Sequence, residues 1–407
     1  MKATIKPSTI SGSVMAPPSK SVAHRYIICA ALSAGKSIVS NIELSEDIKA
    51  TLDCIRACGA TAEVKETDVI IDGITKENIP EEIDFYCRES GSTMRFFMGL
   101  AMYFGKKSRF YGSDTLRKRP FGIYEEICKN QGITFDRSDE YINLEGKIKA
   151  GDYEIAGNIS SQFITGLLYV LPLLEEDSRI HLIPPVESRS YIDLTLQAME
   201  KFGVKASWEG ENDLVIKGGQ KYCACNVEVE GDCSNAAFLE GFNYLGGDVN
   251  VSGVAPDTIQ GDRVYKELFD KLRDDYATID ISDCPDLGPV LFSIAASCHG
   301  AKFTGTKRLK IKESDRGSVM CKELSKLGVD SKMSDNEIEI IAPKDGLKAP
   351  SEIIEGHNDH RIVMSFALLL TITGGIINEA NAVRKSYPSF WDDCIRLGME
   401  VDFDGVD

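Results

Sequence analysis

The sequence predicts an α/β protein of two similar domains, and three observations support this prediction. The chain has 407 residues, which is more than one hydrophobic core usually accommodates, so two domains are expected. Hydrophobic residues make up 43% of the chain, a fraction typical of globular proteins. A helical segment that ends in glycine recurs along the chain, which indicates an internal repeat.

The recurring helices are the first element of the repeat. In five segments, apolar residues fall at helical spacing and a glycine stands where a left-handed residue would end the helix. The segments are 52–60, 123–133, 194–204, 320–329 and 391–399, with glycines at Gly59, Gly132, Gly203, Gly328 and Gly398. A sixth helix, which lacks the final glycine, is predicted over 264–274. The chain therefore contains six repeats.

A second, more apolar helix precedes each of these and begins in a polar cluster. The first such helix is predicted over 19–34 and leads into a β-branched strand over 36–41; the others begin near Ser90, Ser160, Asp232, Pro285 and Asp359. Hairpin-like strands such as 337–341 close the repeats. One repeat alone would fit any α/β protein. Six in register, three to a domain, indicate a duplicated architecture.

Composition excludes several classes of protein. A net charge of −17 argues against nucleic acid as a partner, because a phosphate-binding face is normally basic. No apolar stretch is long enough to span a membrane, and residues 1–13 lack the apolar centre of a secretory signal. We therefore expect a cytoplasmic protein with reduced cysteines. Cys223 and Cys225 lack the spacing of a zinc site, and we expect no metal and no cofactor.

Polar and cationic residues collect where the predicted helices begin. A helix N-terminus carries unpaired backbone donors and a partial positive charge, both suited to anions. In the N-terminal half these residues are Lys20, Ser21, Arg25, Gly91, Arg119, Ser160, Ser161, Gln162, Ser188 and Tyr191. In the C-terminal half they are Asp286, Lys312, Glu313, Arg316, His360, Arg361 and Lys385. The set predicts sites for phosphate and carboxylate ligands, with acid/base groups beside them.

Each of these residues also has an ordinary structural interpretation. The serines and Asp286 are common helix caps. The run from Arg117 to Pro120 fits a solvated turn, and His360 fits the edge of a core. The combination favours function, because capping does not require a cation at so many helix starts.

The motifs, in this order, resemble those of the 5-enolpyruvylshikimate-3-phosphate synthase family. They are Pro18-Ser19-Lys20-Ser21 with Arg25, Ser90-Gly91-Ser92-Thr93-Met94-Arg95, Arg119-Pro120, Ser160-Ser161-Gln162-Phe163, Lys312-Glu313-Ser314-Asp315-Arg316 and Asn358-Asp359-His360-Arg361. The resemblance covers essentially the whole chain. It implies two domains of three βαβαββ units, an inside-out α/β barrel fold hinged around a central cleft. We expect one domain over 18–228, on the shikimate-phosphate side, and the other over 1–17 plus 229–407, on the acid/base side.

The resemblance also implies a reaction. Phosphoenolpyruvate and the 5-hydroxyl of shikimate 3-phosphate are joined by addition and elimination, with release of phosphate, and a monomer is expected. Shikimate 3-phosphate would contact Lys20, Ser21, Arg25, Ser160, Ser161, Gln162, Ser188, Tyr191, Asp286 and Lys312. Phosphoenolpyruvate would contact Lys20, Gly91, Arg119, Gln162, Arg316, His360, Arg361 and Lys385. Asp286 and Glu313 resemble the acid/base pair, assisted by Lys20.

Some features depart from the family pattern, and two alternatives are weighed. Glu89, Phe96 and the run 232–235 are unusual and leave the finer shape of the phosphoenolpyruvate pocket open. The related transferase acting on UDP-N-acetylglucosamine has Lys-Asn in place of Lys20-Ser21, and a reactive cysteine in the loop that matches 112–120, where this chain has none. A non-catalytic anion-binding protein is less favoured, because carboxylates among the cations would weaken binding.

Overall fold

The computed structural model describes residues 1–405, and its contacts divide the chain into two compact units. Unit 2 is Pro18–Glu230, and unit 1 combines Met1–Pro17 with the chain from Gly231 onward. The chain returns from unit 2 to unit 1 after Glu230, two residues beyond the predicted boundary at 228. The reason is local, because the Val229 amide still donates to the Ser40 carbonyl at 3.0 Å, and the Glu230 carbonyl accepts from Ser19 at 2.7 Å.

Unit 2 contains three four-stranded sheets with one shared topology. Their strand orders are β14 (Asn226–Glu228), β3 (Lys36–Ser40), β5 (Asp68–Asp72), β4 (Thr61–Lys65); β6 (Glu82–Tyr86), β7 (Lys107–Tyr111), β9 (Tyr141–Glu145), β8 (Thr134–Arg137); and β10 (Asp152–Ala156), β11 (Ser178–Ile183), β13 (Asp213–Ile216), β12 (Ala206–Glu209). In each sheet the first pair is parallel and the other two are antiparallel. Strand β14, from the end of the unit, completes the first repeat.

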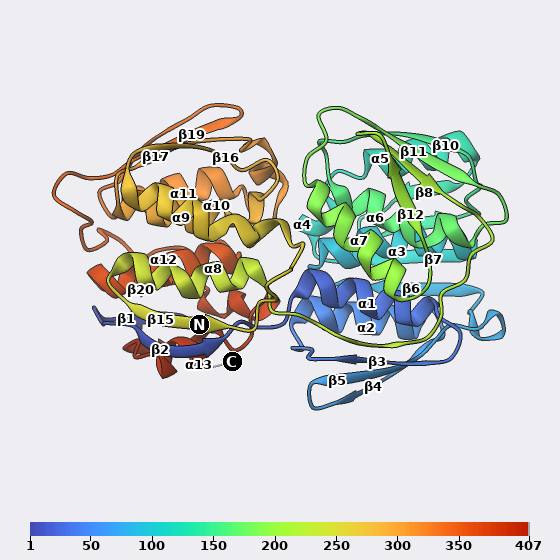
Figure 1. Ribbon diagram of the computed structural model, residues 1–407, viewed down its shortest axis with the longest axis horizontal. Coiled ribbons are helices and arrows are strands. Elements are labelled where there is room, and N and C mark those ends of the chain that lie inside the picture. Colours follow the sequence, from blue (N-terminus) through green and yellow to red (C-terminus); the bar gives the residue numbers. More distant parts are fainter. Residues whose placement is uncertain (406–407) are drawn as a thin grey trace. The chain divides into compact units, whose positions relative to one another are not determined.

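The helices of unit 2 lie inside and its sheets lie outside (Figure 1). They are α1 (Lys20–Leu32), α2 (Glu46–Ala57), α3 (Gly91–Phe104), α4 (Asp114–Arg117), α5 (Gly122–Gln131), α6 (Ser161–Val170) and α7 (Arg189–Lys201), with 3-10 turns η1 (Lys76–Asn78) and η2 (Leu171–Leu173). Helices α3 and α6 approach very closely. A Cβ added to Gly99 would lie 2.2 Å from the Gly166 carbonyl oxygen, so this crossing requires a glycine.

Unit 1 repeats the plan with smaller sheets. Its four-stranded sheet has the order β16 (Ala277–Asp280), β17 (Ala301–Thr304), β19 (Glu337–Ile341), β18 (Asp330–Met333); the others are β20 (Gly375–Ile377), β1 (Lys2–Ile5), β21 (Val401–Asp404) and the pair β15 (Asp248–Ser252), β2 (Ser11–Met15). Strands β1 and β2 bring the first residues of the chain into this unit. The two-domain α/β class predicted from the sequence is confirmed.

The helices of unit 1 mostly lie between its sheets, except that α13 is drawn below β2 (Figure 1). They are α8 (Cys233–Gly241), α9 (Tyr265–Asp274), α10 (Gly288–Ser297), α11 (Arg316–Ser325), α12 (His360–Thr373) and α13 (Phe390–Arg396), with 3-10 turns η3 (Phe242–Leu245), η4 (Gly261–Val264), η5 (Pro285–Leu287), η6 (Lys307–Ile311) and η7 (Ala380–Lys385). Buried aliphatic and aromatic side chains of these helices form its core.

The predicted helix ends are confirmed. Gly59, Gly132, Gly203, Gly328 and Gly398 all have positive φ, between 70° and 103°, a conformation that costs glycine little. Helix α9 begins one residue later than predicted.

Most predicted helix starts are also confirmed. The side chains of Ser90, Ser160, Asp232 and Asp359 each accept a hydrogen bond from a backbone amide in the first turn of the helix that follows. Among the starts predicted in polar clusters, two differ, and α2 begins at Glu46, six residues before the predicted segment 52–60. Pro285 opens a 3-10 turn, and α10 begins only at Gly288. Lys385 ends η7 and does not introduce α13, whose N-cap is Ser389.

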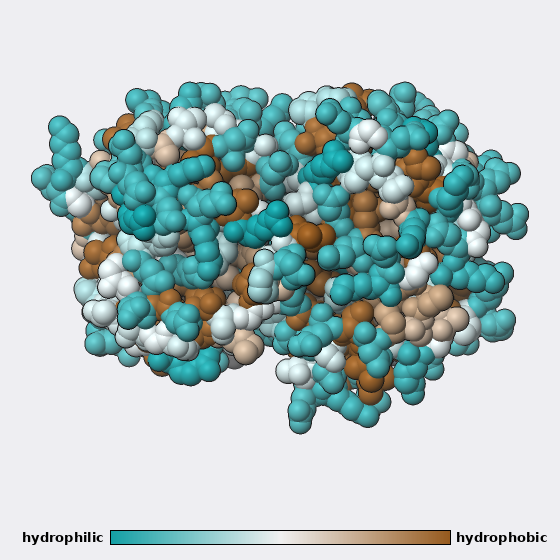
Figure 2. Space-filling view, in the orientation of Figure 1, coloured by the Kyte–Doolittle hydropathy of each residue, from teal (hydrophilic) through white to brown (hydrophobic). Residues whose placement is uncertain are grey.

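The face of the molecule seen in Figure 2 is mainly polar. Hydrophilic residues cover most of it. Across residues 1–405, no helix has both the length and the apolar character needed to cross a membrane. All twelve cysteines are free thiols.

Candidate active site

The helix starts of unit 2 carry cations with few carboxylates nearby. At the start of α1, the Lys20 ammonium lies 2.9 Å from the Asp47 carboxylate, and both side chains are largely buried. Arg25, one turn later, is 3% exposed. Its guanidinium donates to the Thr195 hydroxyl at 2.9 Å and to the carbonyls of Ser21 at 2.7 Å and Tyr191 at 2.9 Å. Arg25 therefore ties α1 to α7 through neutral partners.

The N-terminus of α7 has an unusual backbone. Ser188, its N-cap, is buried and adopts the left-handed region at φ 55°, which is uncommon for a residue with a Cβ. The Tyr191 ring lies beside Arg25, with its centroid 6.0 Å from the guanidinium carbon. Three predicted residues, Arg25, Ser188 and Tyr191, are thus brought together.

A second group forms where α3 and α6 begin. The Gln162 side chain donates to the Ser92 hydroxyl at 2.8 Å and accepts from the Arg95 guanidinium. Gly91 opens α3, and a Cβ there would lie 2.7 Å from Nη1 of Arg119 and 3.2 Å from Nη1 of Arg95. Two guanidinium groups therefore converge on the backbone at Gly91, an arrangement suited to an anion.

The serines at the start of α6 lie beside this group in sequence. Ser160 caps the helix by accepting from the Gln162 amide at 3.4 Å, and Ser161 is its first residue. Both are nearly buried. Arg119 makes no ion pair with any described residue of the chain, so its charge is available to a ligand.

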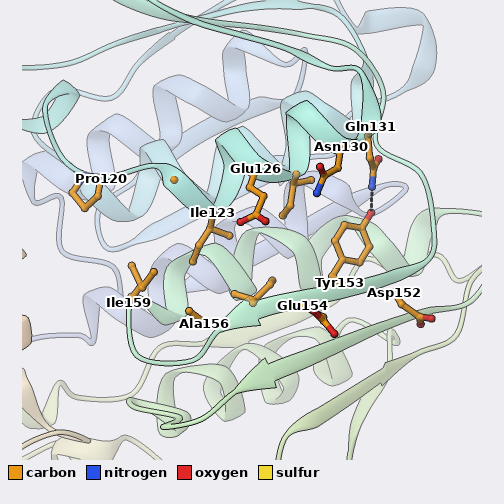
Figure 3. A pocket seen from close by; sticks show the side chains of 13 residues that line it. Pro120, Ile123, Glu126, Asn130, Gln131, Asp152, Tyr153, Glu154, Ala156 and Ile159 are labelled. Atoms are coloured by element: carbon orange, nitrogen blue, oxygen red, sulfur yellow. Dashed lines mark hydrogen bonds between the residues drawn. The ribbon is translucent and has the colours of Figure 1, made fainter.

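A groove of about 670 Å³ between α5 and β10 adjoins these residues (Figure 3). It begins at Pro120 and Ile159, next in sequence to predicted site residues. The carboxylates of Glu126, Asp152 and Glu154 stand among the apolar and neutral polar residues that line the rest of it. These carboxylates would repel an anionic ligand, so we do not include the groove in the candidate site.

In unit 1 the predicted residues form a compact ionic cluster around Asp286. Its Oδ1 lies 3.0 Å from the Lys312 ammonium and 2.9 Å from Nη1 of Arg316, and its Oδ2 lies 3.3 Å from Nη2 of Arg361. Burial alone would raise the pKa of Asp286. The three cations, Arg361 most strongly, outweigh it and hold the pKa well below its ordinary value. Asp286 is therefore ionised in this state.

Arg316 is the centre of the same cluster. It is 1% exposed and pairs with three carboxylates, those of Asp286, Glu313 and Asp359. Burial lowers the pKa of Lys312, against the attraction of Asp286. The arrangement places an ammonium, guanidinium groups and carboxylates within one hydrogen-bonded set, which is suited to moving protons.

Helix α12 contributes the remaining predicted residues of unit 1. His360 and Arg361 are its first two residues and are both buried. The Nη1 group of Arg361 also donates to the Asp286 carbonyl at 2.9 Å. The Lys385 ammonium donates to the Asn358 carbonyl at 2.6 Å, which places it just before this helix.

Sequence reasoning missed Asp47 and Asp262. Asp47 stands in the acidic first turn of α2, where it reads as an ordinary helix-start carboxylate. Asp262 is 2% exposed and accepts from the Ser234 hydroxyl. Burial, then the nearby charge of Asp286, raises its pKa to about 7. Neither signal is visible in a motif, because each depends on which helices pack together.

Known proteins resemble this chain over its whole length. The family model described as EPSP synthase (3-phosphoshikimate 1-carboxyvinyltransferase) matches residues 5–394. A 3-phosphoshikimate 1-carboxyvinyltransferase of Clostridium perfringens is 42% identical, and one of Clostridium kluyveri is 36% identical, each over 98% of both chains. The solved structure of EPSP synthase from Acinetobacter baumannii superposes with a TM-score of 0.79 at 25% identity, covering 99% of this chain and all of that one. The chain belongs to the EPSP synthase (3-phosphoshikimate 1-carboxyvinyltransferase) family.

Proposed function

We propose that the helix-start clusters of both units carry out the reaction of this family. The chain transfers the enolpyruvyl group of phosphoenolpyruvate to the 5-hydroxyl of shikimate 3-phosphate and releases phosphate. This reaction belongs to the shikimate pathway of aromatic amino acid biosynthesis.

The observation that carries these assignments is the state of Arg25. It is a buried cation whose hydrogen-bond partners are a hydroxyl and two carbonyls, and it has no ion pair among the described residues. Burying a charge without a counter-ion is costly, so the site is built for an anion that arrives from outside. We assign Arg25 to the phosphate of shikimate 3-phosphate.

Further groups are assigned to shikimate 3-phosphate together with Arg25. Hydroxyls and an amide can hold a phosphate without adding charge. The residues assigned to this substrate are Ser21, Ser160, Ser161, Gln162, Ser188 and Tyr191 with Arg25 and Lys20 from unit 2, and Asp286 and Lys312 from unit 1.

We assign phosphoenolpyruvate to Gly91 and the Arg119 guanidinium beside it in unit 2, and to cations of unit 1. Arg119 supports this assignment, because none of residues 1–405 forms an ion pair with it, although the chain has a net charge of −17. Arginine binds carboxylate and phosphate oxygens through two parallel hydrogen bonds. The residues assigned to this substrate are Lys20, Gly91, Arg119, Gln162, Arg316, His360, Arg361 and Lys385.

The acid/base roles go to Asp286 and Glu313, with Lys20 assisting. Addition requires a base for the 5-hydroxyl and an acid for the methylene carbon, and elimination reverses the proton flow. Asp286 is ionised but a weak base while three cations surround it. When substrate anions attract those cations, its pKa rises, and Asp286 then accepts the hydroxyl proton. Glu313 serves the methylene group.

We also propose a cytoplasmic monomer. Twelve free thiols are consistent with a reducing compartment.

Phosphate release tests the proposed function. Purified chain mixed with shikimate 3-phosphate and phosphoenolpyruvate should release phosphate only when both are present. UDP-N-acetylglucosamine in place of shikimate 3-phosphate should give none. If micromolar enzyme released no phosphate from shikimate 3-phosphate and phosphoenolpyruvate, the proposal would be wrong. Phosphate release from phosphoenolpyruvate with the UDP-sugar, and not with shikimate 3-phosphate, would point to the related transferase.

A further inference from the structure

A buried chain of hydrogen bonds joins three helices of unit 2. Nδ1 of His24, on α1, lies 2.7 Å from the Thr51 hydroxyl on α2. That hydroxyl lies 2.8 Å from the Thr93 hydroxyl on α3, which donates to the Ser90 hydroxyl at 2.7 Å. All four side chains are at most 1% exposed, so water cannot replace these bonds.

The hydrogen-bond chain lies one helical turn away from Lys20, a predicted site residue. Lys20 and His24 are four residues apart on α1, and Asp47 and Thr51 are four residues apart on α2, so each pair shares one helix face. Lys20 meets Asp47 at 2.9 Å while His24 meets Thr51 at 2.7 Å. Helix α2 therefore holds α1 at two successive turns, one of which carries Lys20.

The last member of the hydrogen-bond chain, Ser90, fixes the start of α3. Ser90 is the N-cap of α3, and its hydroxyl oxygen accepts from the Thr93 amide at 3.2 Å. The next residue is Gly91, where the two guanidinium groups converge. The ring of His24 also packs edge-on against Phe96 of α3, at 6.3 Å between ring centroids. Contacts with α3 thus come from α1 and α2 together.

The donors along the chain can have only one order. A threonine hydroxyl has one proton, and that of Thr93 goes to Ser90. Thr51 must then donate to Thr93, which leaves the Thr51 oxygen as an acceptor for His24. Nδ1 of His24 must therefore carry a proton.

The other ring nitrogen has a different state. Nε2 of His24 is buried and has no hydrogen-bond partner among the residues that the structure describes. Burial, then the charges of Lys20 and Arg25, lowers the pKa of His24 well below its ordinary value. A neutral ring with a proton on Nδ1 has a bare lone pair on Nε2, which matches its lack of a partner.

We propose that His24, Thr51 and Thr93 are positioning residues for the reaction. Their one-way hydrogen-bond chain fixes the neutral Nδ1–H tautomer of His24 and holds the Gly91 turn of α3 in register with Lys20. The kinetic part of this inference rests on the proposed function, which places Lys20 and Gly91 at phosphoenolpyruvate. The tautomer does not depend on it.

Nitrogen NMR of the intact chain, labelled with ¹⁵N in its five histidines, tests the tautomer directly. A His24→Asn variant identifies the signals of His24. We expect a protonated Nδ1 and an unprotonated Nε2 that do not titrate between about pH 6 and pH 8, the range in which an ordinary histidine changes charge. An Nε2–H tautomer or a titrating ring would overturn the hydrogen-bond chain. This measurement requires no variant to fold other than the one used for assignment.

Kinetics test the positioning role with a matched pair of variants. Thr51→Val removes the hydroxyl at nearly constant volume, and Thr51→Ser keeps it. We expect Thr51→Val to lower kcat/KM for phosphoenolpyruvate about tenfold, mainly through KM, because small misplacements of binding groups are costly. Thr51→Ser should stay within about twofold of the wild type. Equal losses in both variants would overturn the positioning role.

A second variant, Thr93→Val, tests the same proposal in case Thr51→Val does not fold. Thr93→Val breaks the chain at its next bond while leaving the Ser90 cap in place, and it should show the same loss as Thr51→Val. Full activity in Thr93→Val would contradict the proposal. A wild-type chain that released no phosphate would instead overturn the proposed function, and the NMR result would still decide the hydrogen-bond chain.

Discussion

Arg316 and Asp359 form a buried, two-point ion pair. Nε of Arg316 lies 2.8 Å from Oδ2 of Asp359, and Nη2 lies 3.2 Å from Oδ1. The same carboxylate accepts from the Arg361 amide at 3.0 Å and so caps α12. One side chain therefore orients the guanidinium of Arg316 and the helix turn that carries Arg361.

The first prediction concerns this carboxylate. Asp359→Ala removes one counter-ion of a buried arginine and a helix cap, so we expect a loss of about 3 kcal/mol in the free energy of unfolding, the low end for a broken buried pair because two carboxylates remain. Asp359→Asn keeps a capping oxygen and should lose about 1 kcal/mol less. Urea denaturation measures both.

A matched control is the cap of the preceding helix. Asp315 accepts from the Ser318 amide at 3.2 Å and has no ion pair among residues 1–405. Asp315→Ala should cost about 1 kcal/mol. Similar losses for Asp315→Ala and Asp359→Ala would contradict the importance of the ion pair.

The second prediction concerns the proposed base. Asp286→Asn keeps the shape of the side chain but cannot accept the hydroxyl proton, so kcat should fall by about 10² to 10⁴. The dissociation constants of both substrates, measured by calorimetry, should change far less, because a base acts in the transition state. Asp283→Asn, an exposed neighbour, should keep full activity. Normal turnover by Asp286→Asn would remove Asp286 from the mechanism.

The third prediction concerns Arg119. Because this side chain makes no ion pair within the described chain, Arg119→Met should leave the thermal midpoint almost unchanged. Loss of charge-assisted hydrogen bonds, at about 1.5–3 kcal/mol, should raise KM for phosphoenolpyruvate about 10- to 100-fold. Lys118→Met changes the same charge on an exposed neighbour and should change neither quantity. Equal effects from both variants would indicate a general electrostatic effect of the loop.

Features of the fold that depend on a few neighbouring residues could be predicted from the sequence, whereas contacts between residues far apart in the sequence could not. The glycines that end helices, such as Gly59, and the caps Ser90 and Asp359 act within one turn, so a short segment of sequence is enough to identify them. The pairing of His24 with Thr51 joins residues 27 apart and depends on how α1 meets α2. Its threonine and histidine are unremarkable in sequence, and only packing gives them a role.

The charged site shows the same limit. Its cations and the carboxylates Asp286 and Glu313 are predicted from motifs, but the counter-ion of Lys20 is not. Lys20 pairs with Asp47, which the sequence presents as one more acidic residue at a helix start. The state of Asp262 depends on burial and on the field of Asp286, neither of which a motif encodes.

The last prediction uses the raised pKa of Asp262. Its folded value, about 7, exceeds the ordinary value of an aspartate, so folding favours its protonated form. This preference contributes fully to the free energy of unfolding at a pH below the pKa that Asp262 has in the unfolded chain. Above that pKa the contribution declines by up to about 1.4 kcal/mol per pH unit. It is lost once the pH passes about 7, the pKa in the folded protein. Asp262→Asn is neutral throughout and lacks this loss. Its stability relative to the wild type, from urea titrations, should therefore rise from pH 5 to pH 8.

Asp257→Asn, on an exposed aspartate, should show a constant difference. A constant difference for Asp262→Asn as well would mean that Asp262 is ionised beside Asp286 at neutral pH.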